Sequence, residues 1–150
     1  TVAYLRARKR RGQRLTMLTA YDFPTAALQD RAGIDIVFVG DSLGTNVLGY
    51  RSSQEVTMAD MLHHARAARR GVERALFLVD MPFGSYQTSP AQALRNAGRL
   101  VQEAGADEMT GAVRGGSMEH VEGGPERKAV GEFLCPADRQ VACRAQRPRS

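Results

Sequence analysis

Two aspartates stand directly after short apolar runs, and a serine follows the first of them. Asp41 and Ser42 come after the run 36–39 and Gly40, and Asp80 closes a second apolar run. Short runs rich in β-branched residues are typical of buried parallel strands, and residues after such strands lie at the carboxyl edge of the sheet. Two carboxylates at one edge suit a hard divalent cation. The pattern therefore predicts a metal site formed by Asp41 and Asp80.

Each of these residues also has a purely structural interpretation. Aspartate and serine cap helices and form turns, so Asp41, Ser42 and Asp80 could have only that role. The residues alone leave both interpretations open. The adjacent pair His63 and His64 falls within a predicted helix, where neighbouring side chains point about 100° apart. We therefore expect packing or surface roles for both histidines rather than a shared metal.

Strands and helices that could position these side chains alternate from about residue 15 to residue 105. Strands are expected over 15–20, 35–39 and 75–80, and helices over 2–10, 24–32, 58–70 and 90–104. This alternation favours a parallel sheet with right-handed crossovers. The stretch 43–55 is predicted as a loop, and its length is more typical of an active site than of a plain turn.

Residue signals mark where these helices begin and which face they bury. Asp22 before Pro24, Thr57 with Asp60, and Ser89 before Pro90 have the residue types of helix N-termini, although Asp22 could instead contribute to the sheet edge. The apolar positions expected to face inward are Ala26, Ala27, Leu28 and Ala32; Met58, Met61, Leu62 and Ala65; and Ala93, Leu94, Ala97, Leu100 and Val101.

Composition excludes some classes of partner. The 150 residues carry a net charge of +5, and the densest basic run, 6–14, has no interleaved aromatic residues or groove-reading motif, so we expect no nucleic-acid partner. The apolar runs are far shorter than the ~20 residues of a membrane span, and no signal-peptide pattern is found. We expect a cytoplasmic protein without a membrane partner. Cys135 and Cys143 have no metal-type spacing.

The character of the sequence changes after Asp107. Residues 108–150 are rich in glycine and end in arginines, with no strand period and no sustained apolar helical stripe. We predict two parts, a strand–helix region over 1–107 and an irregular tail over 108–150. A fourth strand is due after Asp107, but Thr110 and Gly111 interrupt the apolar pattern there, so none is predicted.

Several motifs in the same order resemble the ketopantoate hydroxymethyltransferase (3-methyl-2-oxobutanoate hydroxymethyltransferase) family. The clearest are Met-Leu-Thr-Ala-Tyr-Asp at 17–22, Val-Gly-Asp-Ser-Leu-Gly at 39–44 and Asp-Met-Pro-Phe at 80–83. The resemblance extends over about 2–107. The family is a (β/α)₈ TIM barrel, a fold that needs about 250 residues. It implies an α/β chain that forms the N-terminal part of a TIM barrel, with three strand–helix units.

The resemblance implies a function in pantothenate biosynthesis. A hydroxymethyl group would pass from 5,10-methylenetetrahydrofolate to 3-methyl-2-oxobutanoate, giving 2-dehydropantoate. Mg²⁺ would be held by Asp41 and Asp80, and the substrate would contact Asp41, Ser42 and Asp80. Ser42 would bind the substrate carboxylate, assisted by backbone N–H groups near Leu43 and Gly44. Family members are homo-oligomers, so the same is expected here.

The chain also departs from the family pattern. The family continues after its third helix with a strand that bears a lysine and then a glutamate, and a later glutamate is its usual candidate base; none has a counterpart after Asp107. Catalytic residues are therefore unassigned, and we expect a truncated chain with a divergent or frame-shifted tail. Two alternatives stay open: an inactive fragment or mis-called gene product, and another Mg²⁺-dependent 2-oxo-acid enzyme of the phosphoenolpyruvate mutase or isocitrate lyase type.

Overall fold

The computed structural model describes residues 2–110, so predictions about 111–150, including those for Cys135 and Cys143, lie outside the described residues. The helices are α1 (Val2–Arg10), α2 (Phe23–Arg31), α3 (Leu43–Asn46), α4 (Met58–Arg69) and α5 (Pro90–Ala104), with a 3₁₀ turn η1 at Ser53–Glu55. The strands are β1 (Met17–Thr19), β2 (Ile36–Val39), β3 (Leu76–Asp80) and β4 (Glu108–Thr110). Within the described part of the chain, none of the helices is long and apolar enough to cross a membrane.

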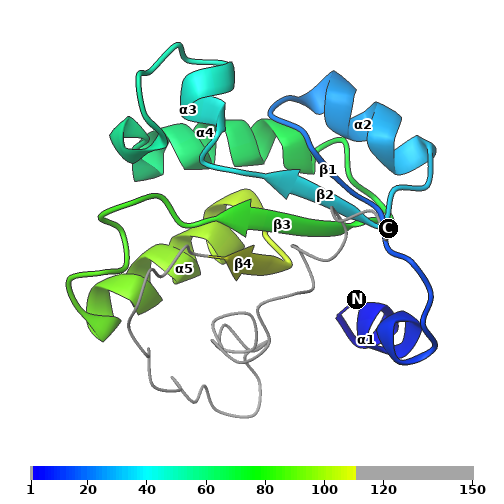
Figure 1. The fold of residues 1–150 in the computed structure, drawn as a ribbon. Coiled ribbons are helices and arrows are strands. Elements are labelled where there is room, and N and C mark those ends of the chain that lie inside the picture. The colour runs from blue at the N-terminus through cyan, green and yellow to red at the C-terminus, as the bar shows by residue number, and fades with distance from the viewer. Residues whose placement is uncertain (1, 111–150) are drawn as a thin grey trace, which may run out of the picture.

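The four strands form one sheet in the order β1-β2-β3-β4, and every neighbouring pair is parallel (Figure 1). The predicted α/β class with a parallel sheet is confirmed. Strands adjacent in sequence are adjacent in the sheet, with α2, the α3–α4 segment and α5 as the three connections. This repeated strand–helix order is that of part of a TIM barrel. Val39 pairs with Val79, so β2 and β3 end nearly level.

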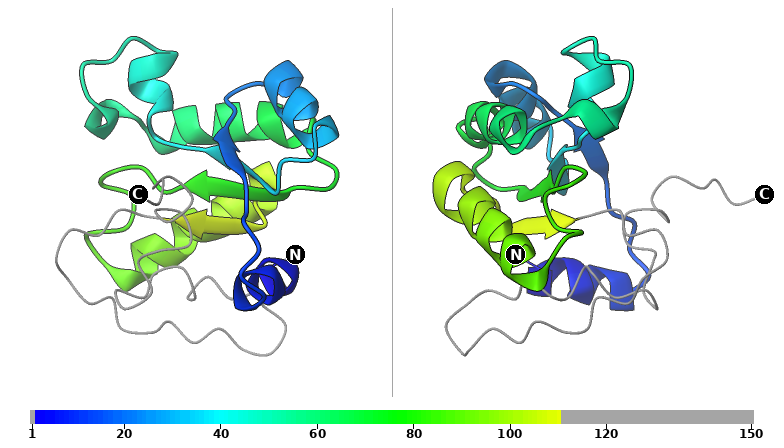
Figure 2. Two further views of the ribbon diagram at one scale, coloured as in Figure 1. Left: turned by 45° about the vertical axis from the view of Figure 1, so that its right-hand side comes forward. Right: turned by 90° about the vertical axis from the view of Figure 1, so that its left-hand side faces the viewer.

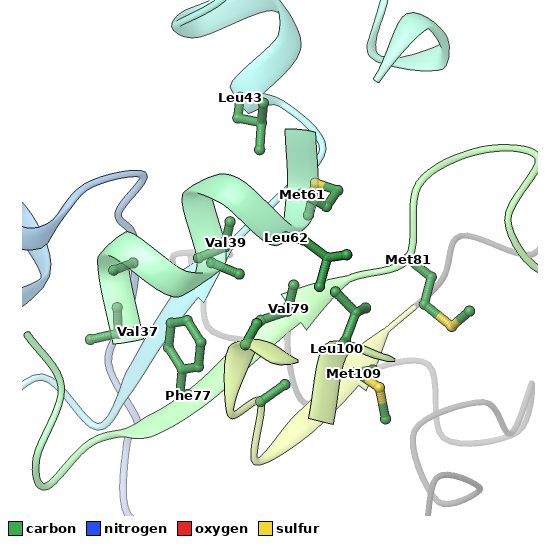
Figure 3. Packing of buried hydrophobic residues seen from close by; sticks show 14 of the residues in the cluster. Val37, Val39, Leu43, Met61, Leu62, Phe77, Val79, Met81, Leu100 and Met109 are labelled. Carbon is green, nitrogen blue, oxygen red and sulfur yellow. The ribbon is translucent and has the colours of Figure 1, made fainter. Parts of the chain in front are cut away.

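The two faces of the sheet carry separate hydrophobic clusters. The face covered by α2, α4 and α5 buries side chains that Figure 3 shows packed together; they include Val37, Val39, Phe77, Val79, Leu100 and Met109. The other face packs Ile36, Leu76 and Leu78 against Leu5 of α1, which lies apart from the other helices (Figures 1 and 2). Side chains alternate along a strand, so Asp80 is in phase with Leu76 and Leu78 and belongs to the face that α1 covers.

The prediction that no fourth strand follows Asp107 is wrong. Residues 108–110 form β4, which pairs with β3 through Leu78–Glu108, Val79–Met109 and Asp80–Thr110. Met81 N also donates to Thr110 O at 2.7 Å. The strand forms because β3 offers a free edge and the core accepts Met109, which is 5% exposed. Tertiary pairing thus overrides the weak local signal of these three residues.

Four predicted core positions are also wrong. Leu28 on α2 is 64% exposed, and Ala32, at the end of the same helix, is exposed as well. Leu94 and Val101 on α5 are 42% and 41% exposed. Each helix buries a narrower stripe than its apolar residues suggest, because the strands behind it cover only one side. The predicted loop 43–55 contains the short helix α3 and the turn η1, in which Ser52 caps the first turn by accepting from Gln54 N.

The predicted helix starts are confirmed. Asp22 accepts a hydrogen bond from Thr25 N at 2.8 Å, and Ser89 accepts one from Gln92 N at 3.2 Å. Thr57 and Asp60 form a reciprocal capping box, in which each side chain accepts from the backbone N–H of the other. These caps satisfy N–H groups that have no partner within the helix. Asp22 therefore caps α2 rather than extending over the sheet edge.

Three aspartates stabilise the starting ends of the strands by accepting hydrogen bonds from backbone N–H groups. Asp30 Oδ1 accepts from Arg74 N at 3.0 Å and from Ala75 N at 2.8 Å, just before β3. Asp35 Oδ2 accepts from Thr16 N at 2.9 Å, and Asp107 Oδ2 accepts from Phe77 N at 3.1 Å. Asp35 also pairs with Arg8 of α1, which ties that helix to the starting edge of the sheet.

Candidate active site

Asp41 and Asp80 lie side by side at the carboxyl edge of the sheet. β3 ends at Asp80, while Asp41 follows β2 by two residues, and the backbone N–H of Asp41 donates to Asp80 Oδ2 at 3.2 Å. Both residues are partly buried. The parallel register that aligns Val39 with Val79 brings the two side chains to this position. The structure thus places next to each other the two aspartates that the sequence singles out.

Gly40 allows this close approach between neighbouring strand ends. A β-carbon at position 40 would lie 3.0 Å from Ser42 Oγ, 3.1 Å from Phe38 Cε1 and 3.4 Å from Asp80 Oδ2. Contacts of 3.0–3.1 Å are tighter than a normal packed β-carbon makes. A larger residue at position 40 would therefore push the Ser42 hydroxyl or the Phe38 ring away from the site.

The carboxyl group of Asp80 is held in an environment that disfavours its charge. Burial, reinforced by the nearby negative charge of Asp41, raises the pKa of Asp80 from 3.8 to about 7, against the opposing effect of the Asp41 N–H. Burial also raises the pKa of the Tyr86 hydroxyl, and the charges of Asp80 and Asp41 add to that effect. A bound cation would relieve the repulsion between the two carboxylates.

The donor set suits Mg²⁺ better than a metal that needs a closed protein cage. Mg²⁺ usually takes one or two carboxylates and keeps several waters, which substrate oxygens can replace. Asp41 and Asp80 supply two hard oxygen donors of that kind. Among residues 2–110, no group of three or more histidine, cysteine or acidic side chains could hold a metal ion. A magnesium ion here would therefore share its coordination sphere with water and ligand.

Ser42 lies at the same edge and is hydrogen-bonded to a residue from the neighbouring strand. Its Oγ is 2.9 Å from the hydroxyl of Tyr21, which follows β1. Asn46 Nδ2, from α3, donates to that tyrosine hydroxyl at 3.3 Å. Near Ser42, the backbone N–H groups of Leu43 and Gly44 donate to Gly40 O and Asp41 O in the turn.

Tyr21 is the site residue that sequence reasoning missed. It follows the first strand of the sheet, just as Asp41 and Asp80 follow the second and third, so the same strand-end argument could have found it. The Nδ1 atom of His64 in α4 lies 2.8 Å from Tyr21 O. His64 thus has a packing role that positions the Tyr21 backbone, while His63 is exposed.

The sequence is similar to one enzyme family over most of its length. A family model for ketopantoate hydroxymethyltransferase matches residues 1–123. The 3-methyl-2-oxobutanoate hydroxymethyltransferase of Moorella thermoacetica is 55% identical over 107 residues, which are 71% of this chain and 40% of that protein. The enzyme of the same name from Syntrophus aciditrophicus is 54% identical over 106 residues, 71% of this chain and 39% of that protein. This chain therefore spans about two fifths of the length of these curated relatives.

The fold is similar to that of a solved enzyme structure with a different name. Oxaloacetate acetylhydrolase in complex with the product oxalate superposes with a TM-score of 0.52 at 16% identity, covering 64% of this chain and 33% of that one. A second structure of oxaloacetate acetylhydrolase gives a TM-score of 0.50 at 15% identity. At this level of identity the likeness shows the fold alone.

Proposed function

Because this chain belongs to the ketopantoate hydroxymethyltransferase family, we propose that it forms the metal- and substrate-binding part of a hydroxymethyltransferase acting on 3-methyl-2-oxobutanoate. One observation carries the proposal: two partly buried aspartates lie next to each other at adjacent strand ends on the carboxyl edge of the sheet, with Asp41 N donating to Asp80 Oδ2 at 3.2 Å. This edge is where barrel enzymes bind their substrates. The reaction would use 5,10-methylenetetrahydrofolate as the one-carbon donor and give 2-dehydropantoate.

In this proposal the roles of the side chains follow from their chemistry. Asp41 and Asp80 would hold Mg²⁺, which would act as a Lewis acid on the keto group of a 2-oxo acid. Ser42 would donate a hydrogen bond to the carboxylate of the same substrate. The partial burial of Asp41 and Asp80 would limit the competition of bulk water for these contacts. No described residue is assigned as the base that removes the substrate proton.

Other features of the family belong to the same proposal. The substrates are small molecules, and we expect a homo-oligomeric, cytoplasmic enzyme. The likeness to oxaloacetate acetylhydrolase supports no second function, because 16% identity is informative about the fold only.

Calorimetry of the chain with MgCl₂ and 3-methyl-2-oxobutanoate would test the proposal directly. Binding of the 2-oxo acid should require Mg²⁺ and should be lost in Asp41→Asn and Asp80→Asn. Glu73→Gln is the matched control, because Glu73 is an exposed acidic residue three residues before β3, at the other end of the sheet. Metal-independent binding, or equal losses in all three variants, would contradict the proposal.

Formation of 2-dehydropantoate from 3-methyl-2-oxobutanoate and methylenetetrahydrofolate is the second measurement. Turnover that disappears in Asp41→Asn would extend the proposal from binding to catalysis by this chain. Metal-dependent binding without turnover would restrict this chain to the binding role that we propose.

A further inference from the structure

We propose that Tyr21 is a positioning residue that directs the hydroxyl hydrogen of Ser42 towards an anionic oxygen of the bound ligand. This inference rests on the proposed function, in which Ser42 binds the carboxylate of a 2-oxo acid. Three side chains carry it: Asn46 on α3, Tyr21 after β1 and Ser42 after β2. They form a chain of hydrogen bonds of 3.3 Å and 2.9 Å.

The direction of this chain follows from its first member. An amide nitrogen can only donate, so Asn46 Nδ2 donates and the Tyr21 hydroxyl oxygen accepts. The hydrogen of Tyr21 must then point elsewhere, and Ser42 Oγ at 2.9 Å is the acceptor within reach. A phenol is also a more acidic hydroxyl than an aliphatic alcohol, which favours the same direction. Ser42 Oγ is therefore an acceptor from Tyr21, and its own hydrogen is free to be donated to a ligand.

The Asn46 amide has its nitrogen towards Tyr21 and its oxygen towards Thr45. Thr45 Oγ1 lies 3.3 Å from Asn46 Oδ1 and 3.2 Å from Ser42 O, so its single hydrogen can be donated to only one of these two acceptors. In the opposite orientation, Asn46 Oδ1 would accept from the Tyr21 hydroxyl, and the direction of the chain would be reversed. The greater acidity of the phenol favours the direction from Tyr21 to Ser42.

The backbone that carries the tyrosine is held on both sides. His64 Nδ1 lies 2.8 Å from Tyr21 O, and the next residue, Asp22, caps α2. The Tyr21 ring is also packed against the main hydrophobic cluster. A hydroxyl on such a fixed ring is preorganised, so ligand binding would not need to reorient it. In the described part of the chain, no further partner of Ser42 Oγ is found that would compete for its hydrogen.

A double-mutant cycle on ligand affinity tests whether Tyr21 acts through Ser42. The Kd of 3-methyl-2-oxobutanoate would be measured at saturating Mg²⁺ in wild type, Tyr21→Phe, Ser42→Ala and the double variant. Loss of a hydrogen bond to a charged group predicts a Kd about 10- to 100-fold higher for Ser42→Ala. Removing only the orienting hydroxyl predicts about 3- to 10-fold for Tyr21→Phe, and less than about 2-fold when Ser42 is already alanine.

Tyr4→Phe is the matched control, because Tyr4 lies on α1, which is tied to the starting edge of the sheet. Its Kd should equal that of wild type. A Tyr21→Phe variant that folds, by circular dichroism, and binds the acid like wild type would overturn the inference. An undiminished effect of Tyr21→Phe in the Ser42→Ala background would overturn it as well, since Tyr21 would then act independently of Ser42.

A measurement without ligand separates this inference from the proposed function. In NMR spectra of the chain, the Tyr21 hydroxyl hydrogen should be protected from exchange with water, and Ser42→Ala should remove that protection. A Tyr21 hydroxyl hydrogen that exchanges as fast as that of the free amino acid tyrosine would refute the proposed hydrogen bond from Tyr21 to Ser42. If the wild-type chain binds neither Mg²⁺ nor the 2-oxo acid, the proposed function fails, and the exchange measurement still decides the direction of the hydrogen bond.

Discussion

Replacing Asp80 with asparagine should stabilise the metal-free chain at neutral and alkaline pH. Folding raises the pKa of this carboxyl from 3.8 to about 7, through burial and through the charge of Asp41. A difference of about three pH units corresponds to about 4 kcal/mol of unfolding free energy, at about 1.4 kcal/mol per unit. Asparagine has almost the same shape, and its oxygen can still accept the hydrogen bond from Asp41 N.

The sign of this effect depends on pH. Well below pH 3.8 the Asp80 carboxyl is protonated in both the folded and the unfolded chain, so it contributes no pH-dependent difference in stability. Between pH 4 and pH 7 the unfolded chain releases this proton while the folded chain retains it, and the unfolding free energy falls. Above pH 7 the full cost is present. Asp80→Asn removes this cost, so its stabilisation should be absent in acid and approach 4 kcal/mol above pH 7.

Urea unfolding of the full chain in EDTA, followed by circular dichroism at several pH values from 4 to 9, would measure this difference. Glu73→Gln is the control for a lost acidic charge at an exposed position. Mg²⁺ should stabilise wild type and leave Asp80→Asn unchanged, because only wild type retains both proposed ligands. If Asp80→Asn lowered the free energy of unfolding, or raised it equally at every pH, the reasoning that this carboxyl lies in an unfavourable environment would be refuted.

Two glycines and one aspartate lead to further predictions, all measured by urea unfolding. Gly71→Ala should destabilise the chain by about 1–3 kcal/mol, because its β-carbon would lie 2.6 Å from Ala27 N and 2.7 Å from Phe23 O in α2. Gly98→Ala should instead stabilise α5 by about 0.5–1 kcal/mol, since a β-carbon at position 98 would have no atom within 4 Å. Equal effects of the two glycine substitutions would contradict the packing argument. Burial alone would raise the pKa of Asp30, but the hydrogen bonds from the N–H groups of Ala75 and Arg74 lower it overall. Asp30→Asn should therefore reduce the free energy of unfolding by about 1–3 kcal/mol near pH 7, and by progressively less as the pH falls below 4. A loss that does not change with pH would indicate a packing defect instead of a lost charge.

Local signals were sufficient to predict much of the fold. The strands β2 and β3 are buried on both faces, and such strands appear in a sequence as continuous apolar runs. The helix starts at Thr57 and Ser89 depend on residues within one turn, so they too can be predicted from the sequence. The positions of Asp41 and Asp80 followed from the parallel sheet, because the strand ends of such a sheet meet at one edge.

Other features depend on partners that are distant in the sequence. Strand β4 has only three residues and forms because β3 and the core accept it, as Met109 illustrates. Leu94 is apolar and lies in α5, but the exposure of a helix face depends on what packs against it. The hydrogen bond between Tyr21 and Ser42 joins residues 21 positions apart, so no local pattern predicts it.

The same amino acid has opposite roles at the two ends of this sheet, which has a consequence for mutational scanning. At the starting edge, Asp30, Asp35 and Asp107 accept backbone N–H groups, so neutral substitutions there should reduce protein abundance in cells. At the carboxyl edge, the negative charges of Asp41 and Asp80 repel each other, so neutral substitutions should preserve or increase abundance while abolishing ligand binding. A scan that scores abundance and binding separately would therefore distinguish the two edges by aspartate substitutions alone.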